Sequence, residues 1–171
     1  MAFTHVLVPT DFSEPARQAL RYALEEAALH HAKVTLLHVL PAHTDTEVYY
    51  ITGAPETQAS FDPVLGGRVS TPRPSQPVVV FQDRYEAALT QLRDSMPDSF
   101  QGAWEAEVAA GSAAETIVRV AQERDADLIV MGTHGRTGLQ HVLLGSVTEK
   151  VVRSAPCPVL TVRYKAPEGQ G

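Results

Sequence analysis

Short apolar runs recur along the chain and stop at proline, glycine or a charged residue. Four of them consist mainly of valine, leucine and isoleucine and hardly alternate with polar residues. Continuous apolar runs of this kind are typical of strands buried on both faces of a parallel sheet. A fifth run, 104–108, alternates Trp, Ala and Val with Glu and predicts a partly exposed edge strand. The four continuous runs are 6–8, 34–40, 128–131 and 159–162.

Segments with helical periodicity separate these runs. From Ala16 to His31, alanine and leucine recur three and four residues apart and form one stripe, while the charged residues fall largely outside it. Ser13 as N-cap and Pro15 in the first turn mark the start of this helix. Three further helices are predicted at 85–96, 113–123 and 146–153.

Two of these helices are predicted to begin with a capping box. In this motif a serine hydroxyl accepts a hydrogen bond from a backbone N–H three residues on, and a glutamate reaches back. Ser112 with Glu115 is one candidate, and Ser146 with Glu149 is the other. Strands and helices thus alternate strictly, which predicts an α/β fold: a doubly wound five-stranded parallel sheet with helices on both faces.

Residues 41–80 interrupt the alternation. Six of the twelve prolines fall in this segment, and it has no helical period. A compact domain rarely holds so long a loop without function or disorder. We therefore expect an irregular insertion, with room for a protein partner, whose ends 49–51 and 78–81 dock on the domain. The rest of 1–165 is predicted to form a single domain, followed by a flexible tail at 166–171.

Composition restricts the function classes. Fourteen Lys and Arg against twenty Asp and Glu give the 171-residue chain a net charge of −6, which argues against nucleic-acid or anionic-membrane binding. The single cysteine, Cys157, excludes an internal disulfide and a Cys-rich zinc site. The N-terminus lacks the basic and apolar regions of a signal peptide, and no apolar run is long enough for a membrane span. We therefore expect a cytoplasmic protein.

The glycine-rich segment 132–148 follows the apolar run 128–131 and leads into a helix. In an open parallel sheet, ligands bind beyond the carboxyl ends of the strands, where the strand order reverses. Glycine lets backbone N–H groups approach an anion closely, and a helix N-terminus attracts phosphate. With hydroxyl donors from Ser146 and Thr148, the segment predicts a phosphate cradle. It is neither a P-loop, because Gly-Lys-Ser/Thr is absent, nor a dinucleotide fingerprint, which would follow the first strand.

The ends of two other strands carry complementary chemistry. Asp11 follows the first strand, where a carboxylate suits the two hydroxyls of a ribose, although an aspartate here can also cap the helix that follows. Backbone groups near Val39, in the second strand, can pair with the edge of an adenine. One ligand, from adenine to phosphate, would then span all three strand ends.

The glycine spacing Gly132-x2-Gly135-x9-Gly145-Ser146 resembles the ATP-binding motif of the universal stress protein family. The opening 5–13 is similar to the first strand and loop of that family. Residues 127–132 and 154–160 resemble its fourth strand and the entry to its last strand. The resemblance covers roughly 1–40 and 81–165, which is most of the chain outside the insertion.

This resemblance implies an adenine-nucleotide alpha hydrolase-like, Rossmann-like domain that acts as a stress-response regulator. It would bind ATP, or ADP or AMP, with Mg²⁺ held through the phosphates, and would form a homodimer through the last strand, Val159–Val162. Asp11 would meet the ribose, and phosphates would lie along the glycine segment. The remaining implied contacts are Pro9, Thr10 and Val39 for adenine, Met131 and Gly132 for the sugar, and Gly135, Arg136, Gly145, Ser146, Val147 and Thr148 for the phosphates.

Two other functions compete with nucleotide-dependent regulation. The same site could serve a slow ATPase or a nucleotidyl or phosphoryl transferase, but the phosphate segment offers no Walker lysine and no clear general base. The His-x-Gly-His signature of nucleotidyl transferases with a related fold is also absent. A protein-interaction module with a vestigial site is the other alternative, and the intact glycine spacing argues against it.

Several side chains have a simpler interpretation beside the functional one. Arg136 is either a phosphate ligand or a solvated loop charge. His134 and His141 suggest a metal pair, but no carboxylate accompanies them, and we interpret both as loop residues. His38 is expected to be a hydrogen-bonded core residue. Cys157 lacks the electropositive setting of a reactive thiol and is expected to be structural.

Overall fold

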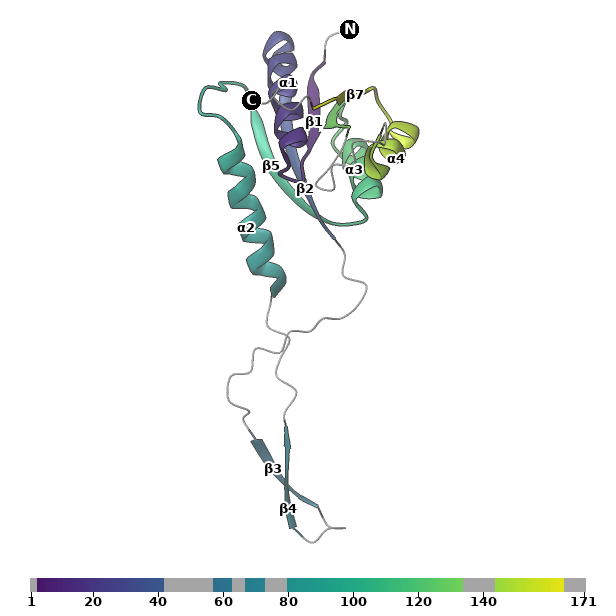
Figure 1. Cartoon of the computed structure of the whole chain (residues 1–171). Helices are drawn as coiled ribbons and strands as arrows, with labels where there is room; N and C mark the ends of the chain where they lie inside the picture. Colours follow the sequence, from purple (N-terminus) through teal and green to yellow (C-terminus); the bar gives the residue numbers. More distant parts are fainter. Residues whose placement is uncertain (1–2, 42–56, 63–66, 73–79, 134–143, 165–171) are drawn as a thin grey trace, which may run out of the picture. The chain divides into compact units, whose positions relative to one another are not determined.

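The computed structural model describes residues 3–41, 57–62, 67–72, 80–133 and 144–164, and gives no side chains for 57–62, 67–72 and 80–83. The chain divides into two compact units, 1–42 with 85–171 and 43–84. The first unit holds a five-stranded sheet and its helices, although α2 begins with residues 80–84 of the second unit (Figure 1). Its elements are β1 (His5–Pro9), α1 (Glu14–His30), β2 (Lys33–Pro41), α2 (Val80–Ser95), β5 (Trp104–Gly111), α3 (Ala113–Glu123), β6 (Leu128–Gly132), α4 (Ser146–Ser154) and β7 (Val159–Val162).

The five strands are parallel and follow the order β5-β2-β1-β6-β7. From β1 the chain winds outward through β2 and β5, then returns to the other side of β1 for β6 and β7. The winding reverses between β1 and β6, and the carboxyl ends of these two strands form the topological switch point of the sheet. This architecture confirms the predicted α/β fold and the edge position of 104–108 in β5.

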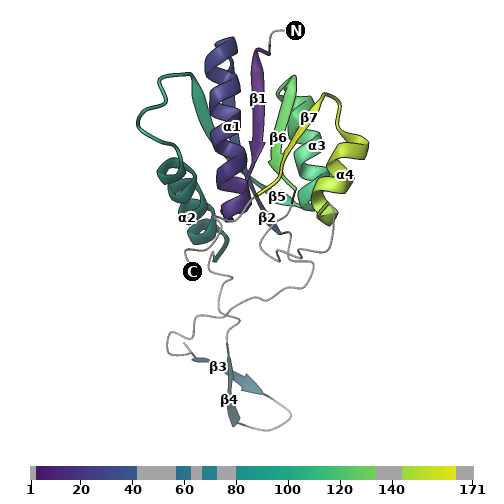
Figure 2. The same ribbon diagram turned by 45° about the horizontal axis from the view of Figure 1, so that its top comes forward.

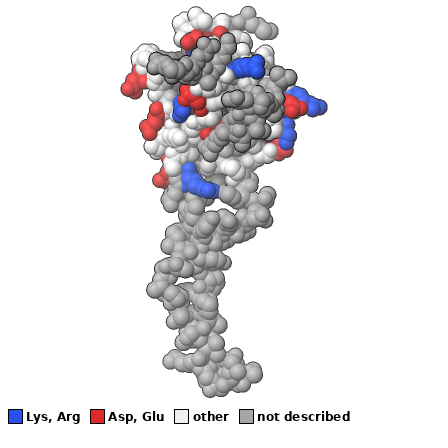
Figure 3. Space-filling view, viewed as in Figure 1, with Lys and Arg blue, Asp and Glu red and all other residues white. Residues whose placement is uncertain are grey.

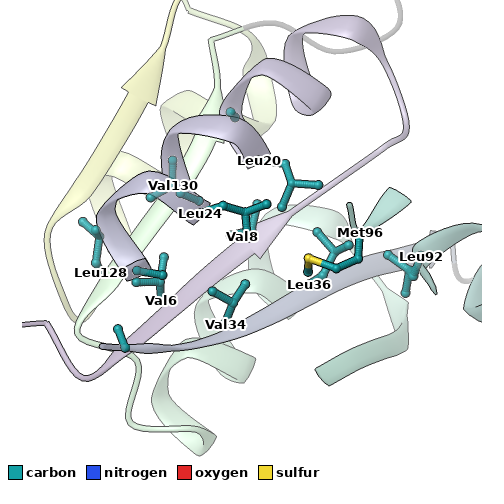
Figure 4. Close-up of a cluster of buried hydrophobic side chains, with 14 of the residues drawn as sticks. Val6, Val8, Leu20, Leu24, Val34, Leu36, Leu92, Met96, Leu128 and Val130 are labelled. Atoms are coloured by element: carbon teal, nitrogen blue, oxygen red, sulfur yellow. The ribbon is translucent and has the colours of Figure 1, made fainter. Parts of the chain in front are cut away.

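Helices α1 and α2 cover one face of the sheet, and α3 and α4 cover the other (Figure 2). The alternation within β1 separates the two cores: Val6 and Val8 pack toward α1, whereas Leu7 packs toward α3, and all three are fully buried. Burial on both faces explains why the sequence of this strand does not alternate. Figure 4 shows the core on the α1 side, where Leu20 and Leu24 of α1 meet strand residues. Each such side chain contributes about 1.5–3 kcal/mol of burial free energy.

The helix starts agree only in part with the predicted caps. Ser13 Oγ accepts from the Ala16 N–H at 3.4 Å, and Pro15 lies in the first turn of α1, as predicted. Both capping boxes are wrong. Ser112 is the N-cap of α3 but makes no side-chain cap hydrogen bond, and α4 has Gly145, not Ser146, as its N-cap. The Gly145 N–H donates to Thr133 O at 2.7 Å, which holds Gly145 extended and makes Ser146 the first helical residue.

The second unit contains a two-stranded antiparallel sheet formed by β3 (Thr57–Asp62) and β4 (Gly67–Pro72). Thr57 lies opposite Pro72, and the pairing continues to Asp62 opposite Gly67. These strands lie inside the segment expected to be irregular. In β3, Ala59 and Phe61 alternate with Gln58, Ser60 and Asp62, a short period-2 signal that sequence reasoning missed, whereas β4 has one large apolar residue, Val69. Of the predicted docking segments, 49–51 and 78–79 fall outside the described residues, as does the tail 166–171, and 80–81 open α2.

Lysine and arginine side chains are interspersed with aspartate and glutamate over the described surface of the face seen in Figure 3. On this face the described lysine and arginine side chains do not gather into one basic patch. Among the described residues, no helix combines the length and apolar character needed to cross a membrane.

Candidate functional site

A cavity of about 310 Å³ opens at the carboxyl edge of the sheet, beside the N-terminus of α4. This volume is at the lower end of the roughly 300–1,000 Å³ usual for small-molecule sites. Ten of the twelve predicted site residues line it; the other two, Gly135 and Arg136, fall outside the described residues. The ten are Pro9, Thr10, Asp11, Val39, Met131, Gly132, Gly145, Ser146, Val147 and Thr148.

Five residues that sequence reasoning did not select also line the cavity. Leu37 and Ile117 belong to the buried core on the α3 side, so their apolar periodicity marked them only as core. His38 was predicted to be a hydrogen-bonded core residue; it is hydrogen-bonded, but it is half-buried and faces the cavity. The last two are small residues at helix starts, Ala16 of α1 and Ala113 of α3.

Beside the cavity, the end of β6 packs closely against the start of α1. A Cβ on Gly132 would lie 3.1 Å from the carbonyl carbon and oxygen of Pro15, so glycine permits this packing. The Thr148 hydroxyl, from a side chain only 4% exposed, donates to Gly132 O at 2.9 Å. Its hydrogen is therefore already used, which corrects the expectation that this hydroxyl would donate to a phosphate. Thr148 instead ties the first turn of α4 to the strand end.

The first turn of α4 supplies backbone donors at the cavity. The Glu149 N–H makes the first intrahelical hydrogen bond, to Gly145 O at 2.9 Å. The amides of Ser146, Val147 and Thr148 come before that bond and point out of the helix end, together with the positive end of the helix dipole. This arrangement creates a local anion-binding field in a chain whose net charge is negative.

Asp11 lies at the half-buried rim. One carboxylate oxygen, Oδ1, accepts hydrogen bonds from the Ser13 backbone N–H at 3.1 Å and from the Ser13 hydroxyl at 2.5 Å. Because Ser13 is the N-cap of α1, Asp11 is not the cap itself but orients the capping residue. The carboxylate is thereby held in a defined position where β1 ends.

Thr10 organises the loop between β1 and α1. Its N–H donates to Leu37 O at 2.8 Å, and its carbonyl oxygen accepts from Nδ1 of His38 at 2.8 Å. Its hydroxyl accepts from the Phe12 N–H at 3.0 Å. Phe12 has a left-handed backbone, with φ 65°, and its ring packs on the His38 ring with centroids 4.5 Å apart. These contacts fix the loop that carries Asp11.

The residues with shifted pKa values lie at the opposite edge of the sheet. Burial alone would raise the pKa of Asp127, but hydrogen bonds from Thr4 and the His5 N–H outweigh burial and lower it. Burial raises the pKa of the Cys157 thiol, and the charge of Asp127 adds to the effect. This agrees with the structural interpretation of Cys157. In the part of the chain that is described, no group of three His, Cys, Asp or Glu side chains could hold a metal ion.

Together, the reversal of strand order, the cavity at that point and the helix N-terminus beside it define a doubly wound α/β protein with a ligand cleft at the switch point. Comparison with known proteins gives the family. The model of the universal stress protein family matches residues 2–163, and the chain belongs to this family.

Individual relatives match over nearly their full length. The universal stress protein MJ0577 of Methanocaldococcus jannaschii is 30% identical over 169 residues, covering 95% of this chain and 96% of its own. Its solved structure superposes with a TM-score of 0.72 at 27% identity, covering 98% and 100% of the two chains. A universal stress protein solved in complex with cAMP shares the fold, with a TM-score of 0.61, 22% identity, and coverage of 95% and 98%.

Proposed function

We propose that this protein is a regulatory adenine-nucleotide-binding protein, with the nucleotide in the cavity at the switch point. One observation carries the proposal. A single cavity is lined by the part of β2 that extends beyond the end of β1, by the carboxylate that follows β1 and by the N-terminus of α4. These three groups match a base, a sugar and a phosphate in that order. The cAMP complex of a protein with the same fold supports an adenine nucleotide as the ligand class.

The adenine would lie against the backbone of Val39. The Lys33 N–H donates to Thr4 O and the Leu37 carbonyl accepts from Thr10, so the odd-numbered residues of β2 direct their polar groups toward the β1 side. Val39 follows the same alternation, but β1 ends at Pro9, opposite Leu37. The N–H and C=O of Val39 can therefore donate to N1 and accept from the amino group of adenine. Guanine carries an acceptor where adenine carries this amino group.

The sugar and phosphates would occupy the other two groups. The oriented carboxylate of Asp11 would accept a hydrogen bond from a ribose hydroxyl, above Met131 and Gly132. The phosphates would lie beside Gly145 and accept hydrogen bonds from the amides of Ser146, Val147 and Thr148. ATP, ADP or AMP would differ in how far they extend along the glycine segment with Gly135 and Arg136. Mg²⁺ would be held through the phosphates and not by a protein cluster.

We also infer a cytoplasmic homodimer, acting in a stress response, that pairs through β7. This strand is at the edge of the sheet and hydrogen-bonds to β6 on one side. Leu160 at its centre is 38% exposed, which leaves an apolar side chain at an edge that a second copy could cover. The second compact unit, 43–84, overlaps most of the segment 41–80, where we propose a protein partner.

Isothermal titration calorimetry with ATP, ADP, AMP and GTP tests the nucleotide proposal. We expect adenine nucleotides to bind and GTP to bind at least about tenfold more weakly, a difference of about 1.4 kcal/mol. Gly145→Val should abolish binding, because the branched side chain would keep the phosphate away from the backbone amides. The variant should still fold, because valine adopts the φ of −67° at this position without strain. Lys150→Ala, on the exposed side of α4, is the matched control. No binding of any adenine nucleotide by the wild-type protein would overturn the proposal.

A further inference from the structure

The hydrogen-bond ladder between β1 and β2 stops one bond earlier than the register of the two strands allows. The Thr10 N–H donates to Leu37 O at 2.8 Å, so the next bond of a parallel ladder would run from the Val39 N–H to Thr10 O. No such bond joins these two described residues. The Thr10 carbonyl is accepting from Nδ1 of His38 instead, at 2.8 Å.

We propose that His38 is the positioning residue that ends the β1–β2 ladder and thereby presents the Val39 N–H to the nucleotide base. The proposal rests on the proposed function for the identity of the ligand, but not for the ladder itself. A carbonyl oxygen only accepts, so Nδ1 carries a proton and already satisfies the Thr10 carbonyl, to which the Val39 N–H would otherwise donate. The His38 side chain thus binds the Thr10 carbonyl in place of the Val39 N–H. The Val39 N–H is then available at the base end of the cavity.

The surroundings of His38 hold its ring in this role. The Phe12 ring packs on the imidazole at 4.5 Å with a tilt of 34°. The Phe12 N–H in turn donates to the Thr10 hydroxyl at 3.0 Å, so the loop holds this oxygen while His38 of β2 holds the Thr10 carbonyl oxygen. The Nδ1–H bond to the Thr10 carbonyl therefore keeps the ladder from extending to Val39.

The proposal predicts a specific effect of removing the donor. In His38→Leu the Thr10 carbonyl loses its partner, and the nearest backbone donor of matching register is the Val39 N–H. The ladder should extend by one bond and close the base end of the cavity. In His38→Asn the Nδ2 amide lies near the position of the imidazole Nδ1 and should keep the ladder open.

Amide hydrogen exchange of Val39 by NMR tests this without any ligand. In the nucleotide-free wild-type protein and in His38→Asn, we expect the Val39 amide to exchange rapidly. In His38→Leu we expect exchange at least about tenfold slower, because the amide becomes part of the sheet. Equal protection of this amide in the wild-type protein and His38→Leu would overturn the proposal, whether or not a nucleotide binds.

A second measurement needs no variant and covers the case in which His38→Leu does not fold. Long-range ¹H–¹⁵N spectra of the wild-type protein report which ring nitrogen of His38 carries the proton. We expect this proton on Nδ1. A neutral ring protonated on Nε2 alone would overturn the proposal.

Binding of a matched ligand pair tests the consequence for the base. AMP and ribose 5-phosphate share the sugar and phosphate and differ by the base. In His38→Leu we expect AMP affinity to fall at least about tenfold and ribose 5-phosphate affinity to change less than about twofold, with His38→Asn close to the wild type for both. An equal loss for both ligands would overturn the role at the base. If the wild-type protein binds neither, the proposed function fails, and the Val39 exchange data still decide the role of His38 in the ladder.

Discussion

The buried hydroxyl of Thr148 donates to the carbonyl oxygen of Gly132 at 2.9 Å, and this bond joins the first turn of α4 to the carboxyl end of β6. The two residues are sixteen positions apart, on either side of the glycine segment. The bond therefore holds the helix N-terminus against the strand end, and both residues line the cavity.

Replacing Thr148 with valine should remove this bond without changing side-chain volume. The Gly132 carbonyl then loses its partner, and we expect a loss of about 1–2 kcal/mol in the free energy of unfolding. Urea denaturation followed by circular dichroism measures it. Thr148→Ser keeps the hydroxyl and should lose less than Thr148→Val; the reverse order would show that the methyl group matters more than the hydrogen bond.

Gly132→Ala should disturb the contact between β6 and α1. The added Cβ would lie 3.1 Å from backbone atoms of Pro15, and the start of α1 would have to move by a few tenths of an ångström. Overpacking of this kind costs about 1–3 kcal/mol, measurable as a shift of the urea midpoint. Gly145→Ala, where φ is −67°, is the control and should leave stability nearly unchanged. Equal stability of Gly132→Ala and the wild type would mean that α1 adjusts at no cost.

The stability of the folded protein at low pH should depend on Asp127. Hydrogen bonds from Thr4 and the His5 N–H lower its folded pKa against the raising effect of burial. A carboxyl with a lowered folded pKa stabilises the fold above its unfolded pKa of about 3.9 and loses that stabilisation as pH falls through the folded value. Asp127→Asn should therefore lower Tm by roughly 2–4 °C at pH 7, and the difference should shrink below about pH 3.9.

Differential scanning calorimetry from pH 7 to pH 3 measures this dependence. Asp98 is exposed, and Asp98→Asn serves as a charge-matched control with little effect on Tm. A Tm difference between Asp127→Asn and the wild type that stays constant over the whole range would show that the effect does not come from ionisation of Asp127.

Leu160→Lys should convert the proposed dimer to a monomer. A lysine at the centre of β7 places a charge at the sheet edge, which is how natural edge strands avoid pairing. Size-exclusion chromatography with light scattering gives the mass of the species. Leu29→Lys replaces an apolar residue on α1 that is 73% exposed, and this variant should remain a dimer. A monomeric wild-type protein would contradict the proposed interface.

The sequence by itself determined the strands of the five-stranded sheet, the helices beside it and their order along the chain. Unalternating valine and leucine runs identified strands buried on both faces, and the α1 stripe identified the helix that covers them. The alternation of these elements implies a parallel sheet, and the strand ends then locate the cleft. The resemblance to the universal stress protein family supplied most of the individual site residues, and ten of the predicted residues line one cavity. These inferences succeed because periodicity and chain connectivity are local properties, readable before the chain folds.

Only the tertiary structure decided how individual polar groups are used. Capping by Gly145 instead of Ser146 depends on a bond to Thr133, and the Thr148 hydroxyl is taken by a strand end sixteen residues away. His38 looks like a core residue in sequence because its role depends on the Thr10 carbonyl, twenty-eight positions earlier. A hydrogen bond needs a partner at a particular distance and angle, and only packing brings together partners that are distant in the chain.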